Sequence, residues 1–379
     1  MYLLERLFGI AAYVYMLGMA CVLIAFTKVN IKTVLRLYIA GLCVMGFFYT
    51  PSATGDLHRI YEAMDWYATM DLGHFFEELV VTSTVPASRL LFWAVAKTGV
   101  NRLLPVVSAV VCYGLIFSTM EKSRQLCNIS RQNFAIALFV LMTTSIYISV
   151  VGGVRMMLAM SMVVYCFFRE TVEQKFGPRH VIFYLIAALM HNMGVVMLVM
   201  RLVAIVLDGS KKLWLRLGIV AVAVAAAAVV LLRYGFFVSA IMSKVYSYLV
   251  EESHSDTWEY IIGVLLLAGV VTVFVKYRAC GCPGKYPALK EFNFCMHLST
   301  VLGVLFCFVF TIFYRFVGHL TPILAMPMLM ATLQESEEER PRGAVQISFR
   351  MAVLLYGCIV LIISCTRGSL SSLKFFVLS

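Results

Sequence analysis

Apolar runs with few charges recur from one end of this chain to the other, and they restrict its fold more than any other feature. The clearest runs are Leu7–Phe26, Leu103–Ser118, Phe134–Val151, Leu217–Leu232 and Met351–Ser364. A helix needs about 20 predominantly apolar residues to cross the hydrocarbon core of a bilayer. Because 62% of the 379 residues are hydrophobic, one soluble core could not bury them all. The sequence therefore predicts an all-α integral membrane protein, with residues 1–379 as a single domain and Leu7–Phe26 as a retained first helix rather than a cleaved signal peptide.

Basic residues are concentrated in alternate connections between the apolar runs. Cytoplasmic loops of membrane proteins carry an excess of Lys and Arg, so the alternation predicts a polytopic bundle of about 12 spans with both termini facing outward. Anionic lipid beside these loops also explains the net charge of +11, and no nucleic acid partner is expected. The basic connections are Lys28–Arg36, Lys122–Arg131, Arg169–Arg179, Lys211–Arg216, Lys276–Lys290 and Arg340–Arg350.

Two segments depart from this regular pattern. Phe75–Ala96, in the outer connection after the second span, is apolar but is interrupted by acidic residues, Pro86 and Arg89. This favours an interfacial or re-entrant helix. Val181–Leu207 is too long for one span and is interrupted at His191–Gly194, which predicts two short helices meeting at a polar turn on the outer side. Non-helical backbone at that depth is tolerated only where it is buried in protein or lines a cavity.

Ionisable residues at the outer ends of the spans are the candidates for function, because a charge within a bilayer costs about 2.5–3.5 kcal/mol on insertion scales. An Arg guanidinium is a planar fork of donors that matches phosphate oxygens and keeps its charge when desolvated. Several arginines around one cavity therefore predict a diphosphate site, where a carboxylate or imidazole could take a proton from an attacking hydroxyl. The topology brings six candidates to one membrane face: Asp56, Arg59, Tyr61, Arg155, His191 and Arg315.

Structural explanations of the same residues stay open at this point. Arg59 could stabilise a loop or meet lipid phosphates, and Arg155 and Arg315 could end a span or snorkel to the interface. Asp56 could cap a helix, and His191 could bond to backbone at the helix break. We assign structural or interfacial roles to Arg201, Arg233, Lys244, Tyr314 and His319.

Cysteines give no sign of a metal site in the sequence. The 11 cysteines lie mostly within apolar runs and include no Cys-x-x-Cys pair. Cys280 and Cys282 are the only close pair, and we interpret them as reduced thiols in a cytoplasmic turn. No Gly-rich phosphate loop or nucleophile elbow is present either. The sequence therefore predicts chemistry without a metal or a cofactor.

The candidates stand in a defined order along the chain. An Asp-x-x-Arg-x-Tyr segment at Asp56–Tyr61 precedes a helix with Arg155 and Ala159, a basic loop, an Ala-rich helix that ends at His191, and Arg315. This order resembles the EpsG-type branch of the Wzy-like bacterial polysaccharide polymerases, from the first span to about Leu333. The charged positions agree with the family, whereas Met156 replaces a frequent Gln and Met193 a frequent small hydroxyl residue.

The resemblance implies an activity and a role for each candidate. Such proteins join oligosaccharide repeat units carried on polyprenyl diphosphate into exopolysaccharide, capsule or O-antigen, at the outer face of the bacterial inner membrane. Arg59, Arg155 and Arg315 would bind the diphosphate, His191 and Asp56 would be catalytic, and Tyr61 would contact sugar. The lipid-linked oligosaccharide and the bilayer would be partners, together with flippase and chain-length regulator proteins.

Three questions about this function stay open in the sequence. A flippase for lipid-linked oligosaccharides would also need a basic cavity, although transporters more often have internal symmetry, which we do not find here. A glycosyltransferase or ligase that transfers a single sugar or chain would use the same residues as a polymerase. Of the two candidate bases, His191 is favoured, because Asp56 lies three residues before Arg59 and is expected to pair with it.

Overall fold

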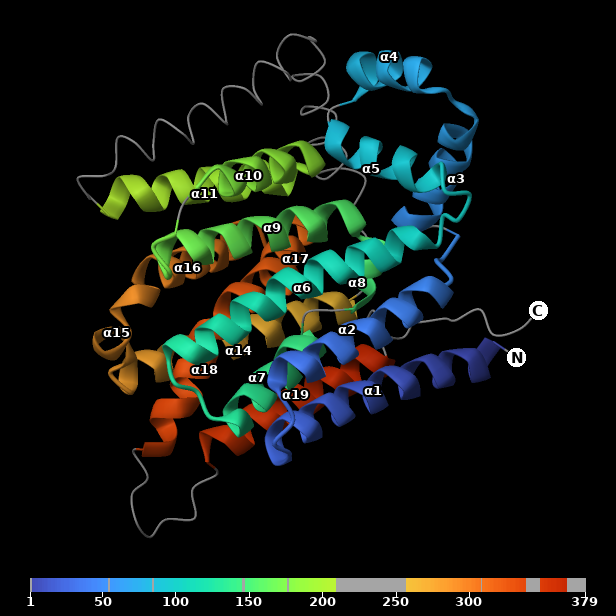
Figure 1. Cartoon of the computed structure of the whole chain (residues 1–379). Coiled ribbons are helices and arrows are strands. Elements are labelled where there is room, and N and C mark those ends of the chain that lie inside the picture. Colours follow the sequence, from blue (N-terminus) through green and yellow to red (C-terminus); the bar gives the residue numbers. More distant parts are fainter. Residues whose placement is uncertain are drawn as a thin grey trace.

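The computed structural model describes residues 2–208, 257–338 and 348–366, apart from positions 54, 84, 145, 146, 176 and 308. These residues form helices joined by short connections, with no strand among them, so the predicted all-α class is confirmed for this part of the chain. Figure 1 shows the long helices side by side in one bundle, with α3, α4 and α5 at one end. The helices are α1 (Tyr2–Phe26), α2 (Ile31–Phe48), α3 (Asp56–Thr69), α4 (Leu72–Thr82), α5 (Pro86–Ala96), α6 (Leu103–Leu126), α7 (Arg131–Thr144), α8 (Tyr147–Gly152), α9 (Val154–Thr171), α10 (Pro178–Met190), α11 (Asn192–Asp208), α14 (Thr257–Ala279), α15 (Cys282–Lys285), η2 (Pro287–Leu289), α16 (Lys290–Leu305), α17 (Phe310–Tyr314), η3 (Arg315–Leu320), α18 (Thr321–Glu338) and α19 (Phe349–Thr366).

Six helical segments of the described chain are long and apolar enough to cross a membrane. The protein is therefore a membrane protein, while the count of about 12 spans stays a prediction. The run Phe134–Val151, predicted as one span, is divided between α7 and α8. The predicted span Leu217–Leu232 lies outside the described residues. The six segments are Leu7–Phe26, Ile31–Phe48, Leu103–Leu126, Tyr260–Ala279, Phe310–Ser336 and Phe349–Thr366.

The outer helices bury one face and leave an apolar face uncovered. On α1 the buried side chains are Tyr13, Leu17, Ala20 and Ile24, at the spacing of a single helix face. Tyr15, on the other side of α1, is 68% exposed. Uncovered apolar side chains also occur on α2, α14 and α19, and lipid accommodates them at no cost, whereas a monomer in water rarely exposes such patches.

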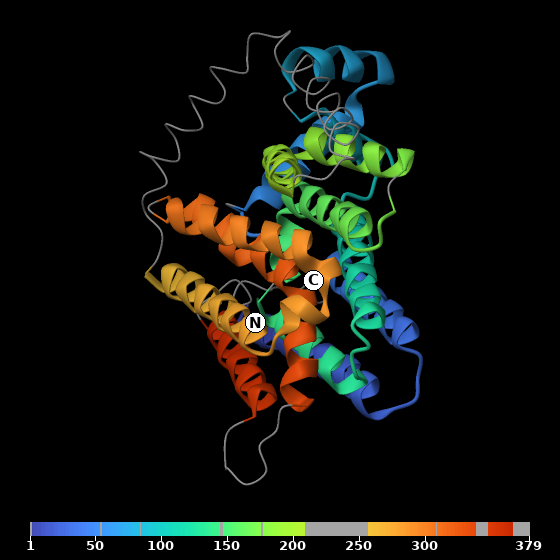
Figure 2. The ribbon, with the colours of Figure 1, turned by 90° about the vertical axis from the view of Figure 1, so that its left-hand side faces the viewer.

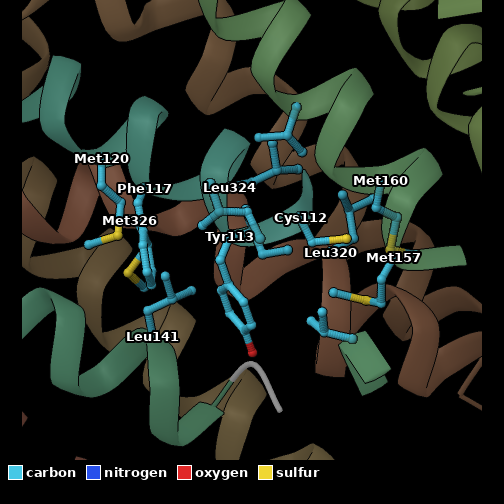
Figure 3. Packing of buried hydrophobic residues seen from close by; sticks show 14 of the residues in the cluster. Cys112, Tyr113, Phe117, Met120, Leu141, Met157, Met160, Leu320, Leu324 and Met326 are labelled. Atoms are coloured by element: carbon cyan, nitrogen blue, oxygen red, sulfur yellow. The ribbon is translucent and has the colours of Figure 1, made fainter. Parts of the chain in front are cut away.

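The segment Phe310–Ser336, which includes most of α18, lies at the centre of the bundle, and its residues 316–333 are all buried. Side chains from α6, α7, α9 and α18 pack together in this core, including Tyr113, Leu141, Met157 and Met326 (Figure 3). Three buried hydroxyls, those of Tyr13, Ser108 and Tyr147, donate to backbone carbonyls of neighbouring helices, with a distance of 2.8 Å from Tyr147 to the Leu42 carbonyl. Leaving such a group unpaired would cost about 1–3 kcal/mol.

The described basic loops meet at the end of the bundle opposite α3–α5. Arg131, at the start of α7, donates to the carbonyls of Ile24 and Val29 beside the α1–α2 loop, at 2.8 and 2.7 Å. Lys122, near the end of α6, pairs with Glu173 after α9 at 2.9 Å. The described basic loops thus lie at one end of the bundle, and their assignment to the cytoplasmic side stays a prediction. The basic loops at 211–216 and 340–342 lie outside the described residues.

The two irregular segments each divide into two helices. Phe75–Ala96 gives α4 and α5, with Pro86 as the first residue of α5, and α4 lies beyond α5 at the edge of the molecule (Figures 1 and 2). The interfacial or re-entrant character of this segment stays a prediction. Val181–Leu207 divides into α10 and α11 as predicted, and His191 between them has extended backbone with φ −161° and ψ 147°.

Candidate functional site

A cavity of about 680 Å³ lies at the end of the bundle formed by α3 and α5. Its volume is within the usual range for a ligand site. Its described walls come from α3, α5, the start of α9, the α10–α11 break, α17 and η3. The cavity brings together five of the six predicted site residues, which are Asp56, Arg59, Arg155, His191 and Arg315. Because they come from distant parts of the chain, only the tertiary fold can assemble them.

Local sequence fixes how each helix presents its residues to the cavity. Leu57, Ile60 and Met64 are buried on α3, and the adjoining face of this helix presents Asp56 and Arg59 to the cavity. Arg155 is the second residue of α9, two positions after Gly153 at the N-cap. A Cβ at Gly153 would lie 2.9 Å from the Ser149 carbonyl oxygen, so this tight connection requires glycine.

Asp56 is bound by Arg155 and not by Arg59, so the predicted pairing of Asp56 with Arg59 is wrong. The Arg155 Nη2 atom donates to both carboxylate oxygens of Asp56 at 3.1 Å. Arg155 arrives from another helix and reaches the carboxylate at the start of α3, a contact that spacing along one helix could not indicate. Arg59 is exposed in the cavity and has no carboxylate partner among the described residues, so its guanidinium is available to an anion.

His191 bonds to backbone and lines the cavity as well. Its Nδ1 atom accepts a hydrogen bond from the Met193 N–H at 3.1 Å. A neutral imidazole that accepts at Nδ1 holds its proton on Nε2, so the second nitrogen is a donor. The backbone is closely packed at this helix break, because a Cβ at Gly194 would lie 2.2 Å from the Ala187 carbonyl oxygen. This geometry favours hydrogen-bond donation by His191 over proton abstraction.

Arg315 belongs to η3, a π-helical turn that also presents His319 to the cavity. The rings of Tyr314 and His319 meet edge to face, with their centroids 4.9 Å apart. Tyr314 and His319, for which the sequence favoured structural or interfacial roles, both line the cavity. The four-residue spacing from Arg315 to His319 could have indicated that His319 lies beside Arg315, since residues at this spacing share a helix face.

Arg89 of α5 is a further cavity residue that sequence reasoning did not select. Its Nη1 atom lies 3.5 Å from the Glu78 carboxylate of α4. With Arg59, Arg155 and Arg315 it gives this cavity four guanidinium groups, against a single carboxylate among the described lining residues, Asp56. The excess of positive charge suits a polyanionic ligand.

Tyr61 does not line this cavity. Its hydroxyl is buried and finds no hydrogen-bond partner among the described residues, and burial raises the pKa of the phenol. Arg201, in contrast, is structural as predicted: its side chain is 1% exposed and pairs with Glu170 at 2.8 Å and Glu291 at 3.1 Å. Arg233 and Lys244 lie outside the described residues. In the described chain, no group of three or more His, Cys, Asp or Glu is placed to hold a metal ion.

The helical bundle defines a membrane protein with an arginine-lined cavity at one end. The EpsG family matches residues 74–375, and the chain belongs to this family of polysaccharide-polymerase-like membrane proteins. Arg155, His191 and Arg315 lie within the matched residues, whereas Asp56 and Arg59 precede them. The match thus begins later and ends further along the chain than the resemblance described above. No curated protein and no solved structure matches the chain.

Proposed function

We propose that this protein is a polymerase that joins polyprenyl-diphosphate-linked oligosaccharide repeat units at the outer face of the bacterial inner membrane. The observation that carries the proposal is the convergence of Arg59, Arg155 and Arg315, with His191, on one cavity at the end of the bundle away from the basic loops. The product would be an exopolysaccharide, capsule or O-antigen chain. A flippase would supply the substrate to this face, and a chain-length regulator would be a second partner.

In the proposed reaction a sugar hydroxyl of one unit attacks the anomeric carbon of another. The new bond joins the hydroxyl oxygen to that carbon, and the bond from the carbon to the diphosphate oxygen breaks. The diphosphate leaves with the bonding electrons, and Arg59, Arg155 and Arg315 stabilise its charge, since fixed donors aimed at a developing anion contribute strongly in a low-dielectric site. The Nε2–H of His191 donates to the same oxygens.

The hydroxyl proton goes to Asp56 in this scheme. Asp56 is the carboxylate in the described wall of the cavity, and the 3.1 Å contact with Arg155 orients it. His191 is less suited to this step, because its Nδ1 is engaged by the Met193 N–H. This reverses the preference for His191 that the sequence alone suggested, and it assigns acceptor activation and leaving-group stabilisation to different residues.

The test is incubation of the purified protein with lipid-linked repeat units, with products separated by length. A ladder of products is expected, and its loss in Arg155→Ala with the protein still folded would support the assignment of the cavity. Arg179→Ala removes the same side chain from an exposed position outside the cavity and should leave the ladder intact. A single product of one added unit would instead indicate a single-transfer glycosyltransferase, and movement of substrate without any new bond would indicate a flippase.

A further inference from the structure

A second cavity lies at the opposite end of the bundle, between α2 and α6. Its volume is about 360 Å³, and none of its lining residues belongs to the site described above. Figure 1 shows α2 and α6 side by side along their length. The cavity extends along α6 from Lys122 and Gln125 near the helix end to Gly114, about 12 Å deeper at 1.5 Å per residue.

The outer part of this cavity is cationic. Lys32 and Arg36 are exposed one turn apart on α2, and neither has a carboxylate partner among the described residues. The nearby carboxylates are already neutralised: Glu121 by Arg124 at 2.7 Å, and Glu173 by Lys122 at 2.9 Å and by Arg169 at 2.8 Å. A phosphate entering here would meet two cations with no competing anion.

The inner part of the cavity is apolar and open. Leu35, Ile39 and Phe117 form its walls. A Cβ at Gly114 would meet nothing within 4 Å, so space is available beside this residue. The neighbouring Leu37 on α2 is an uncovered apolar side chain at the lipid-facing surface. Charge at the mouth and apolar walls below it match a phospholipid, whose phosphate is joined to hydrocarbon chains.

We propose that this cavity binds one anionic glycerophospholipid, with its phosphate between Lys32 and Arg36 and an acyl chain along Ile39, Phe117 and Gly114. Basic pockets between membrane helices at the cytoplasmic side bind anionic head groups in this way. A zwitterionic lipid of the same chain length is a poorer ligand, because its ammonium group is repelled by the two cations.

The experiment is native mass spectrometry of the purified full chain in detergent, with phosphatidylglycerol or phosphatidylcholine of identical acyl chains. Phosphatidylglycerol should be retained in preference. The double variant Lys32→Ala/Arg36→Ala should weaken its binding about 30-fold, since each basic residue near an anionic lipid contributes roughly a factor of five. Gly114→Leu should weaken binding as well, because the new side chain starts from an open Cβ position and occupies the apolar part.

Two matched controls separate this site from general effects. Lys28→Ala/Arg179→Ala removes two exposed cations from the same end but outside the cavity, and Gly18→Leu adds the same side chain at an open position on α1. Both controls should retain the lipid. Unchanged binding by Lys32→Ala/Arg36→Ala, an equal loss in Lys28→Ala/Arg179→Ala, or equal retention of phosphatidylcholine would overturn the proposal. Tighter binding of a polyprenyl phosphate at this cavity would overturn the choice of a glycerophospholipid.

Discussion

Replacing Asp56 by Asn tests whether this carboxylate takes the proton of the attacking hydroxyl. The amide has nearly the same shape and keeps one oxygen that can accept from Arg155, but it cannot act as a base. General bases contribute about 10²–10⁴-fold to rate, so turnover should fall by at least about 100-fold. The length distribution of the products should shift toward short chains as the rate falls.

The stability of the protein should change little in Asp56→Asn. Asp56 and Arg155 approach to 3.1 Å, but their side chains are 43% and 32% exposed, so solvent screens the pair. Pairs of this kind contribute about 0.2–1 kcal/mol. The thermal unfolding midpoint in detergent should therefore stay close to that of the unmodified protein, while activity is lost.

The assay is the initial rate of chain elongation by purified protein across a range of pH, with thermal unfolding measured on the same samples. Asp65→Asn is the matched control, because Asp65 lies on the same helix outside the cavity and accepts a hydrogen bond from Asn101 at 2.6 Å. Elongation by Asp56→Asn at nearly the normal rate would refute the role of this carboxylate. A loss of activity that is matched by a loss of folded protein would show that Asp56 stabilises the fold and is not a base.

Further outcomes are expected elsewhere in the chain. His191→Ala should lower turnover by about 10²–10³-fold, as for loss of an oxyanion donor, and should leave the acidic limb of the pH–rate profile in place; disappearance of that limb would make His191 the base. Gly194→Ala should destabilise the protein by about 1–3 kcal/mol in denaturation, because its Cβ would lie 2.2 Å from the Ala187 oxygen, whereas Gly177→Ala meets nothing and serves as the control. Arg201→Met should cost about 3–5 kcal/mol by leaving the buried Glu170 without its partner, and unchanged unfolding would contradict this. Cysteines placed at Lys122, Lys175 and Lys285 should resist an impermeant thiol reagent in intact cells, whereas one at Asp65 should react; the reverse pattern would invert the proposed orientation.

Sequence alone could locate features that interrupt a strong local pattern. The break between α10 and α11 was predictable because Asn192 and Gly194 interrupt an apolar run that is too long for one span. The grouping of basic loops at one end followed from charge, since alternate loops share a side of the membrane. The arginines of the cavity were selected for a similar reason, because a charge near the end of an apolar helix needs an explanation.

Tertiary contacts decided the features that the sequence could not predict. The partner of Asp56 is Arg155, about one hundred residues away, and the nearer Arg59 was the natural but incorrect choice. The division of Phe134–Val151 into α7 and α8 follows Thr143 and Thr144, hydroxyl residues that membrane helices also tolerate, so the local signal for it is weak. Tyr61 lies in the motif of the resemblance, yet its hydroxyl is buried and it is not among the residues that line the cavity.

The π-helical turn η3 sets the rotational phase between the cavity and the core of the bundle. A π turn contains an extra residue relative to an α turn, and one residue corresponds to about 100° of rotation about the helix axis. Removing one residue from Arg315–Leu320 would turn Arg315 through that angle relative to α18, whose side chains are fixed by packing on all sides. Deletions within this turn should therefore abolish function while the core stays intact. Related chains should have no insertion or deletion within these six positions.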